Sequence, residues 1–439
     1  MIENILTKYD GFFFLGIGGV SMSALAKILR SSGKKVAGCD RSESEYTQYL
    51  KSAGIGVTIG NPSSFEGFDV VVYTDALSDC NPWIIAARRQ RKVLISRGKL
   101  LAELAKNYKK TIAVAGCHGK TTCTAMLAHV FSYAGEKFTA HIGGDDLSFS
   151  NGYACGNDFF LTEACEYKKN FLYLKPEVAV ILNSDADHLD CYGSVENLKK
   201  AYLQFADSSA LTVKLYGDLP EASGVTFGLD DRADYYAKKI KNEGGKYSFS
   251  AFKGQSELGR VKLSVYGKHN VLNALAVIAV SDICGIDFTL ICRGLAQFKG
   301  VKRRFEEIGE YNGARCIADY AHHPNEIKAA LKTAKTLTDG ELYVIFQPHT
   351  YSRTKTLFGQ FAHTLSGVKR LLIYKTFAAR EYFDDAGSAL TLSNALKRSA
   401  YGDCEIDIEN FLRPARRGDI VLFLGAGDIY EIAKTVIES

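Results

Sequence analysis

The eight residues from Ala115 to Thr122, AGCHGKTT, carry the clearest chemistry in the 439-residue chain. They follow an apolar stretch typical of a strand and precede a stretch typical of a helix, so backbone N–H groups at the turn favour phosphate oxygens. Lys120 adds a mobile positive charge, and the Thr121 hydroxyl can reach a magnesium ion. The spacing is a shortened variant, G-x-x-G-K-T, because position 114 is valine. A chance Gly-Lys-Thr turn is the alternative, and the flanking strand and helix favour an ATP site.

Carboxylates after two further apolar stretches could bind the magnesium ion that a P-loop requires. Glu163 ends the stretch FFLTE, and Glu166 follows closely, although an acid past a strand end is by default a solvated turn residue. The stretch VAVILNSDADHLD ends in a polar cluster of Asn183, Asp185, Asp187, His188 and Asp190. Because ligands bind at the carboxyl edge of parallel sheets, His188 among these carboxylates favours a metal ligand over a structural histidine.

A second group of polar residues lies in the C-terminal half. Asn270 and Asn273 fall one helical turn apart on one face, where capping explains the first and not the second. Polar strand ends follow in VKRRF, IADYAHHPNEI and VIFQPHTYSRT, with Arg303, Arg304, Asp319, Tyr320, His322, His323, His349 and Arg353. Arginines so placed can clamp phosphate or carboxylate, and surface ion pairing is their alternative role. In a region without its own P-loop, they suggest a surface that faces the nucleotide.

The first glycine-rich loop, in FFFLGIGGVSMS, leaves two interpretations open. A strand, a glycine turn and a helix open dinucleotide-binding domains, and Asp40 ends the second expected strand, where such folds hold a ribose. The third glycine of the G-x-G-x-x-G fingerprint is missing, since Gly16, Gly18 and Gly19 are followed by Ser21. The loop therefore binds either a nicotinamide dinucleotide or another phosphorylated ligand.

Three α/β domains must position these motifs. The length suggests about three domains at roughly 150 residues each. Apolar strands alternate with amphipathic helices in the first hundred residues and again after residue 300, which is typical of parallel sheets covered on both faces. Between residues 210 and 266 polar and apolar residues alternate, as in antiparallel strands. We predict a Rossmann-like parallel sheet in residues 1–107, a central P-loop ATPase-like domain with an added antiparallel sheet in 108–299, and a Rossmann-like C-terminal domain in 300–439.

Composition narrows the class of protein further. Hydrophobic residues make up 46% and charged residues 23% of the chain, as in soluble globular proteins. The net charge of +5 is spread along the chain, so we expect no nucleic-acid partner. The first residues show no basic region followed by a long apolar core, and the sequence has no apolar stretch near about 18 residues and no C-x-x-C pair among its 11 cysteines. We expect a cytoplasmic protein with free thiols and without membrane insertion.

Together these motifs resemble the Mur ligases of peptidoglycan synthesis along essentially the whole chain. The resemblance rests on GIGGVSMSALA, AGCHGKTTCTAM, DADHLD, HNVLNALA, RRFE, DYAHHPNEI and FQPHTYSRT, in this order. It implies an ATP- and Mg²⁺-dependent ligase that joins L-alanine to the lactyl carboxylate of UDP-N-acetylmuramate through an acyl phosphate. A ligase that attaches a recycled tripeptide to the same sugar nucleotide is the alternative. A nicotinamide oxidoreductase and a silent nucleotide-binding paralogue are remoter ones.

The resemblance also implies roles for individual residues. The catalytic residues would be Lys120, Glu163, His188 and Arg304, and the magnesium ligands Thr121, Glu163 and His188. ATP would contact Gly116, Cys117, His118, Gly119, Lys120, Thr121, Thr122, Asn270, Asn273, Arg304 and Asp319. The UDP-sugar would contact Gly16, Ile17, Gly18, Gly19, Val20, Ser21, Asp40 and Thr74. The amino acid would contact Tyr320, His322 and Arg353, and we expect a monomer or a weak homodimer.

The chain departs from the family pattern in three places. Cys117 stands where threonine is common, next to backbone donors that tolerate the change. Cys165 and Lys168 replace acids of an E-A-D-E-S-D run, which alters the surroundings of the magnesium site. Thr350 replaces an arginine of some members, so Arg353 becomes the candidate for the alanine carboxylate.

Overall fold

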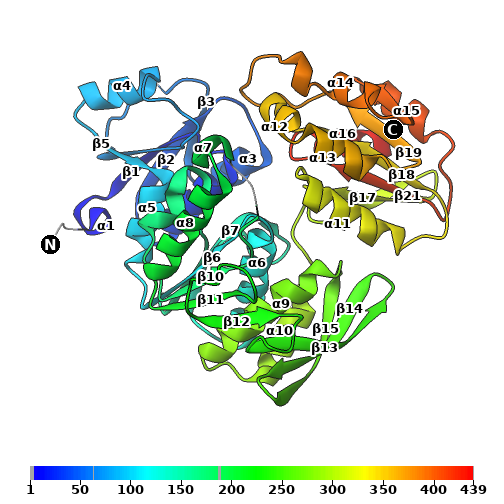
Figure 1. Ribbon diagram of the computed structural model, residues 1–439. Coiled ribbons are helices and arrows are strands. Elements are labelled where there is room, and N and C mark those ends of the chain that lie inside the picture. The colour runs from blue at the N-terminus through cyan, green and yellow to red at the C-terminus, as the bar shows by residue number, and fades with distance from the viewer. Residues whose placement is uncertain (1–3, 63, 186–188, 439) are drawn as a thin grey trace. The chain divides into compact units, whose positions relative to one another are not determined.

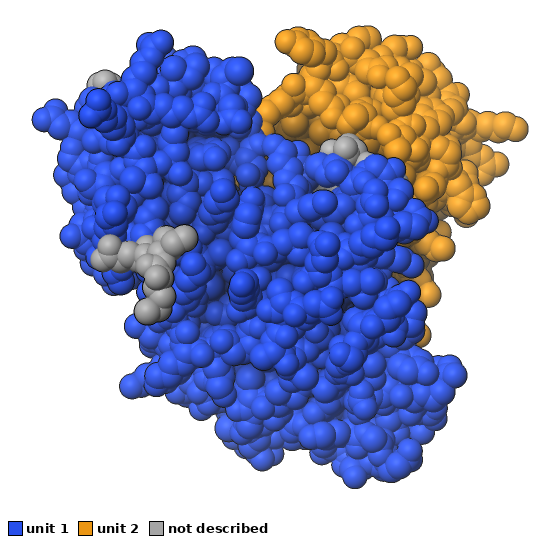
Figure 2. Space-filling view, turned by 60° about the vertical axis from the view of Figure 1, so that its left-hand side comes forward, with its two compact units in different colours: residues 1–239, 249–262, 272–299 blue, residues 240–248, 263–271, 300–439 orange. Residues whose placement is uncertain are grey.

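The computed structural model describes residues 4–62, 64–185 and 189–438, and its strands form three sheets (Figure 1). The chain divides into two compact units, shown in Figure 2: residues 1–239, 249–262 and 272–299, and residues 240–248, 263–271 and 300–439. The three-sheet α/β class predicted from the sequence is confirmed. The boundaries at 107/108 and 299/300 stay a prediction, because the first unit holds the whole first sheet and most of the second. None of the described helices is both long and apolar enough to cross a membrane.

The first sheet is parallel, with the strand order β3-β2-β1-β4-β5. Its strands are β1 (Gly11–Leu15), β2 (Lys35–Asp40), β3 (Gly56–Ile59), β4 (Val70–Tyr73) and β5 (Val93–Ser96). Its helices are α1 (Ile5–Lys8), α2 (Val20–Ser31), α3 (Glu45–Ser52), α4 (Pro82–Arg89) and α5 (Arg97–Ala105). The strand order reverses between β1 and β4, so the loops after these two strands meet at the position where such sheets bind ligands.

The central sheet has ten strands in the order β15-β14-β13-β12-β11-β10-β6-β9-β7-β8. Its strands are β6 (Lys110–Ala115), β7 (Phe138–Asp146), β8 (Ser150–Ala154), β9 (Phe159–Glu163), β10 (Val178–Ile181), β11 (Leu211–Leu215), β12 (Val225–Gly228), β13 (Tyr235–Glu243), β14 (Lys246–Lys253) and β15 (Ser256–Tyr266). Its helices are α6 (Lys120–Tyr133), η1 (Tyr167–Tyr173), α7 (Leu189–Tyr192), α8 (Val195–Asp207), α9 (His269–Ile283) and α10 (Phe288–Gln297). The P-loop strand β6 lies between the parallel strands β9 and β10, so the predicted nucleotide site lies at the carboxyl ends of central strands and not at an edge strand.

Helix α2 of the first sheet packs against the edge hairpin β7–β8 of the central sheet. Asn151 Nδ2 on β8 donates hydrogen bonds to Val20 O at 2.6 Å and to Ser23 Oγ at 2.7 Å. Gly152 approaches the helix so closely that a Cβ there would lie 3.1 Å from the Ala24 Cα. One buried hydrophobic cluster runs from Leu6 to Ala222 and includes side chains of both sheets. The two sheets therefore share a core within the first unit.

The third sheet has six strands in the order β16-β17-β21-β18-β19-β20, with only the edge strand β16 antiparallel to its neighbour. Its strands are β16 (Glu306–Tyr311), β17 (Ala314–Asp319), β18 (Leu342–Phe346), β19 (Arg370–Tyr374), β20 (Ser399–Gly402) and β21 (Ile420–Leu424). Its helices are α11 (Pro324–Lys335), α12 (Tyr351–Thr356), α13 (Phe358–Leu365), η2 (Asp385–Gly387), α14 (Ala389–Asn394), α15 (Glu405–Leu412) and α16 (Ile429–Glu438). Two of the predicted His- and Arg-rich segments follow β17 and β18, at one edge of this sheet. The third, VKRRF, was predicted as a strand end but precedes the edge strand β16.

Candidate active site

The loop between β6 and α6 requires glycine at two positions. Gly116 has φ +140°, and a Cβ there would lie 3.1 Å from the Leu182 Cβ. Gly119 has φ +86°, and its Cβ would lie 2.7 Å from Asn273 Oδ1. Such backbone conformations and close approaches favour glycine. Gly119 is also the N-cap of α6 and supplies no capping side chain, which suits a helix N-terminus that receives a phosphate.

Lys120, the first residue of α6, pairs with a buried carboxylate. Its Nζ lies 3.0 Å from both oxygens of Glu166 and donates a hydrogen bond to Gly116 O. The Glu166 side chain is 1% exposed and the Lys120 side chain 16%. Burial disfavours the charged lysine, but the attraction of Glu166 outweighs it and raises the pKa of Lys120 above its usual value. Glu166, whose role the sequence left open, is thus the counter-ion of the P-loop lysine.

The rest of the P-loop is held by the segment that follows β10. Asn183 Oδ1 accepts a hydrogen bond from His118 N, and Asn183 Nδ2 donates one to His118 O, both at 3.0 Å. Cys117 is buried, and its thiol donates to Asp185 O at 2.8 Å. Thr121 is buried in the first turn of α6, and Thr122 beside it is half-buried. The other predicted metal ligand of this segment, His188, lies outside the described residues.

Glu163 ends β9 directly beside the P-loop strand. It pairs with Val114 of β6, and one of its carboxylate oxygens accepts a hydrogen bond from Gly143 N on β7. Position 143 has no room for a side chain, because a Cβ there would overlap this carboxylate. A carboxylate and a hydroxyl are oxygen donors of the kind that magnesium prefers, so Glu163 and Thr121 fit the predicted metal site in their chemistry.

The first glycine loop is stabilised by the acid that the sequence assigned to the ligand. Asp40 Oδ2 accepts a hydrogen bond from Gly18 N at 2.8 Å, and Asp40 Oδ1 accepts one from Arg41 N at 2.7 Å. A Cβ at Gly18 would lie 2.9 Å from Asp40 Oδ2 and 2.8 Å from the Thr47 methyl group. Asp40 therefore fixes the loop conformation, whatever it also binds.

The remaining predicted sugar-nucleotide residues surround the same turn. Gly16 has φ +84°, and a Cβ there would lie 3.1 Å from the Thr74 methyl group, which places Thr74 beside the loop. The amides of Gly16 and Ile17 donate to Cys39 O at 2.8 and 3.0 Å. Gly19 caps α2 without a side chain, Val20 begins the helix, and Ser21 Oγ lies 2.8 Å from His141 Nε2 on β7. Ser21 thus connects the loop to the central sheet.

In the second unit, Asp319 organises the turn that carries Arg304. Its carboxylate accepts hydrogen bonds from Phe305 N at 2.8 Å and from Ala321 N at 2.7 Å. Burial raises the pKa of Asp319 to about 6, although the nearby Arg304 opposes this shift. The Arg304 guanidinium lies 4.9 Å from the centre of the Tyr320 ring. The structure therefore brings together three of the predicted residues, Arg304, Asp319 and Tyr320.

The predicted amino-acid residues form a second cluster in the same unit. His322 Nδ1 lies 3.3 Å from the Glu326 carboxylate, and its ring lies 6.0 Å from the His349 ring. Arg353 Nη1 donates to His349 Nδ1 at 3.2 Å. Burial and the positive charges nearby lower the pKa of His349 to about 3, so this histidine is neutral. The backbone of Thr350 has φ +67°, a conformation that no sequence pattern predicted.

The two asparagines of α9 fall in different compact units. Asn270 belongs to the second unit and donates to Tyr266 O at 2.7 Å. Asn273 belongs to the first unit and lies against Gly119 of the P-loop. Both are buried. The sequence suggested capping for Asn270, whereas its side chain donates to a preceding carbonyl group from inside the helix. Contact with the P-loop accounts for Asn273.

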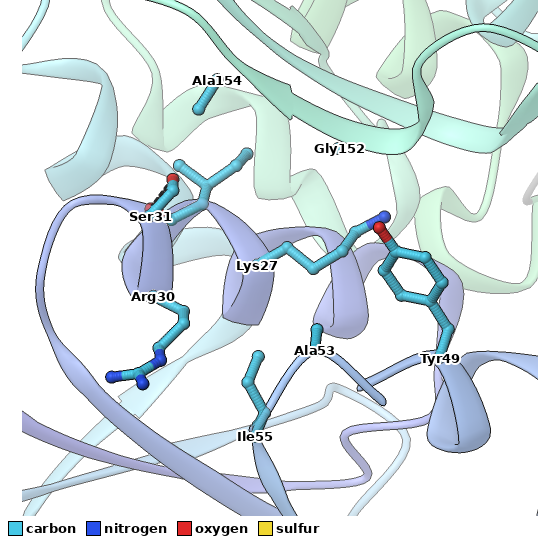
Figure 3. A pocket seen from close by; sticks show the side chains of 9 residues that line it. Lys27, Arg30, Ser31, Tyr49, Ala53, Ile55, Gly152 and Ala154 are labelled. Carbon is cyan, nitrogen blue, oxygen red and sulfur yellow. Dashed lines mark hydrogen bonds between the residues drawn. The ribbon is translucent and has the colours of Figure 1, made fainter. Parts of the chain in front are cut away.

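A cavity of about 240 Å³ lies between α2, α3 and β8, and includes none of the predicted site residues. Figure 3 shows Lys27 extending to Tyr49, and the Lys27 Nζ lies 4.7 Å from the centre of that ring. Lys27 also donates to Ser150 Oγ at 3.1 Å. Burial lowers the pKa of Lys27 to about 8, against the attraction of Asp145.

The chain combines three α/β sheets with two glycine loops that precede helices and a lysine paired with a buried carboxylate. These features define the class of protein as a multidomain enzyme that acts on phosphorylated substrates. Three family models match successive parts of the chain: the catalytic domain of the Mur ligase family at residues 12–109, the Mur ligase middle domain at 114–281, and the Mur ligase glutamate ligase domain at 303–427. The chain belongs to the Mur ligase family.

Individual relatives agree with this assignment. The chain is 40% identical to the UDP-N-acetylmuramate–L-alanine ligase of Clostridium acetobutylicum over 96% of each sequence. It is similar to the crystal structure of the UDP-N-acetylmuramate–alanine ligase of Thermotoga maritima, with a TM-score of 0.84 and 32% identity over 98% of each chain. A murein peptide ligase from Psychrobacter arcticus shares the fold, with a TM-score of 0.76 and 24% identity over 97% of this chain and 98% of that one.

Proposed function

We propose that this protein is an ATP-dependent ligase that joins L-alanine to UDP-N-acetylmuramate. The observation that carries the proposal is the P-loop, in which Lys120 lies beside Glu166 and next to the strand that ends at Glu163. The relatives named above, which match the chain almost end to end, support the choice of both substrates. The alternative, a nicotinamide-dependent oxidoreductase, would assign no function to this lysine–carboxylate site.

The proposed reaction has two steps. The lactyl carboxylate of the sugar nucleotide attacks the γ-phosphorus of ATP, ADP leaves, and an acyl phosphate forms. The amine of L-alanine then attacks the acyl carbon, loses a proton, and inorganic phosphate leaves as the amide forms. Lys120 and the amides of the P-loop stabilise the charge that moves onto the phosphate oxygens, which is the main source of catalysis in phosphoryl transfer.

We assign the magnesium site to Thr121, Glu163 and the predicted ligand His188. A bound magnesium ion would supply charge neutralisation at the phosphates. Gly143 N orients the Glu163 carboxylate for this role, and Asn183 holds the loop that precedes Thr121. In the second unit, Arg304 and Asp319 are proposed to contact ATP together with Asn270, and Tyr320, His322 and Arg353 to contact the amino acid.

Phosphate release tests this function directly. Purified protein receives ATP, Mg²⁺ and UDP-N-acetylmuramate, and each amino acid or the recycled tripeptide is added in turn. We expect release that requires both the sugar nucleotide and L-alanine. Release with the tripeptide alone would make the protein a recycling ligase, and no release under any condition would refute a ligase. A cytoplasmic location and a monomeric or weakly dimeric state stay predictions from the sequence.

A further inference from the structure

Arg97, the first residue of α5, is a cation that the sequence did not single out. Its side chain is 12% exposed, its Nη1 donates to Ser21 Oγ at 3.4 Å, and its Nη2 lies 3.7 Å from Asp75 Oδ2. A guanidinium has five N–H donors. Among the described residues, Ser21 is the one hydrogen-bond acceptor of this group, so most of its donors can still bind an anion.

A chain of hydrogen bonds fixes the hydroxyl that touches Arg97. Thr162 Oγ1 donates to Glu163 O at 3.1 Å, so it must accept from His141 Nδ1, which lies 3.0 Å away. His141 then carries its proton on Nδ1, because burial and the charge of Arg97 lower its pKa to about 3 and keep it neutral. Its Nε2 therefore accepts the proton of Ser21, 2.8 Å away.

This direction leaves Ser21 Oγ with lone pairs only, and these face Arg97. Ser21 cannot donate to a phosphate while it donates to His141, but it can hold a guanidinium in place. Asp75 adds a second fixed point, because Asn170 Nδ2 donates to Asp75 Oδ2 at 2.8 Å. Arg97 is thus oriented from two sides by groups whose own positions are fixed.

Arg97 is connected to both the first glycine loop and the segment that holds Lys120. On one side it contacts Ser21 in the first turn of α2. On the other side its partner Asp75 accepts a hydrogen bond from Asn170, which lies in η1 shortly after Glu166, the counter-ion of Lys120. The segment that follows Glu163 is therefore connected to both cations, to Lys120 through Glu166 and to Arg97 through Asn170 and Asp75.

We propose that Arg97 binds the carboxylate of the sugar nucleotide that accepts the phosphoryl group, and so selects a carboxylate-bearing substrate. The inference rests on the proposed function. The accepting carboxylate must reach from the sugar-nucleotide loop to the γ-phosphate at Lys120, and Arg97 is a cation with vacant donors on that path. A guanidinium matches the two oxygens of a carboxylate, which a lysine cannot do. The diphosphate of the same ligand is the competing anion, and the test below separates the two.

Calorimetric binding of two sugar nucleotides provides the test. UDP-N-acetylmuramate carries the lactyl carboxylate, whereas UDP-N-acetylglucosamine has the same uridine diphosphate without it. Arg97→Gln should weaken binding of UDP-N-acetylmuramate by about 10-fold or more, the loss typical of a charged hydrogen bond, and leave UDP-N-acetylglucosamine within about 2-fold. Arg97→Lys should restore part of the loss. Arg88→Gln, at an exposed arginine of α4 that pairs with Asp79, is the matched control.

Each outcome decides the matter. An equal loss of affinity for both ligands would assign Arg97 to the diphosphate. Unchanged affinity for both would give Arg97 a purely structural role. Either result overturns the proposal. UDP-N-acetylglucosamine binding also reports whether a variant is folded. If Arg97→Gln does not fold, Asp75→Ala, which removes the second fixed point of Arg97, must show the same selective loss. A wild-type protein that binds no UDP-N-acetylmuramate would refute the proposed function itself, which is a different result.

Discussion

The two glycine loops of the first unit obtain their positive charge in different ways. In the P-loop, Lys120 begins the helix that the loop feeds, and Glu166 holds it. In the first loop, the first turn of α2 has no cation, and Arg97 reaches Ser21 from α5, 76 residues further along the chain. A cation inside a motif can be recognised from eight residues of sequence, whereas a cation from another helix becomes visible only after folding.

The largest expected effect concerns the cation of the P-loop. Lys120→Ala should lower ATP-dependent phosphate release by about 10³-fold or more, because the charge that stabilises the transferring phosphoryl group is lost. Circular dichroism should still report a folded protein, although Glu166 loses its partner and the melting temperature falls. Lys109→Ala, at an exposed lysine paired with Asp158, is the control. Activity within 10-fold of wild type would remove Lys120 from the site.

The two loops should fail separately when a methyl group is added. Gly119→Ala strains a backbone with φ +86° and crowds Asn273, so it should raise KM for ATP by about 10-fold. Gly18→Ala crowds Asp40 and Thr47, so it should raise KM for the sugar nucleotide by about 10-fold instead. Gly359→Ala in α13, where the added Cβ meets no atom within 4 Å, should leave both constants unchanged. If both glycine variants impair the same substrate, the assignment of separate ligands to the loops is wrong.

The first loop is supported by the neutral His141, whereas the P-loop is supported by the ion pair of Lys120 and Glu166, so a change of pH should affect the two supports differently. His141, which supports the first loop, has a folded pKa of about 3, below its unfolded value. The unfolded chain therefore binds an extra proton between about pH 6.5 and 3, so this part of the stability is complete above pH 6.5 and lost as the pH falls. Between pH 7 and pH 5 the wild type should lose about 2 kcal/mol of unfolding free energy that His141→Gln does not lose.

Urea unfolding at the two pH values measures this difference. His363→Gln, at an exposed histidine of α13, is the control variant. His141→Gln should also raise KM for the sugar nucleotide by about 3-fold, since one hydrogen bond that orients Ser21 is weakened. Equal pH dependence in wild type and His141→Gln would contradict a neutral buried histidine.

The smallest effect is expected at Cys117, where the P-loop departs from the family pattern. Cys117→Ser keeps a donor for Asp185 O, so KM for ATP should change by less than about 2-fold. Cys117→Val keeps the volume and removes the donor, so it should have the larger effect on the same constant. A stronger effect of serine than of valine would show that packing, not the hydrogen bond, sets the loop position.

The sequence predicted what is local and left out what is assembled by packing. The apolar strands, the order of the motifs and the glycine positions of the P-loop follow from short stretches of residues. The partners Glu166, His141 and Arg97 were not assigned, because each contacts its loop from an element far away in the chain. An acid past a strand end, a histidine inside a strand and an arginine after one have no distinctive spacing. Likewise, Asn273 had no explanation until the P-loop was seen beside it.

The hydrogen bonds from Asn151 to α2 have a consequence for how the protein is made. During synthesis the first sheet is complete once β5 has emerged, but β8, which covers one side of α2, ends only at Ala154. A nascent chain that stops near residue 107 would therefore leave apolar side chains of the shared core in water. The first sheet reaches full stability only when the central sheet joins it, so a fragment of residues 1–107 should aggregate or remain partly folded.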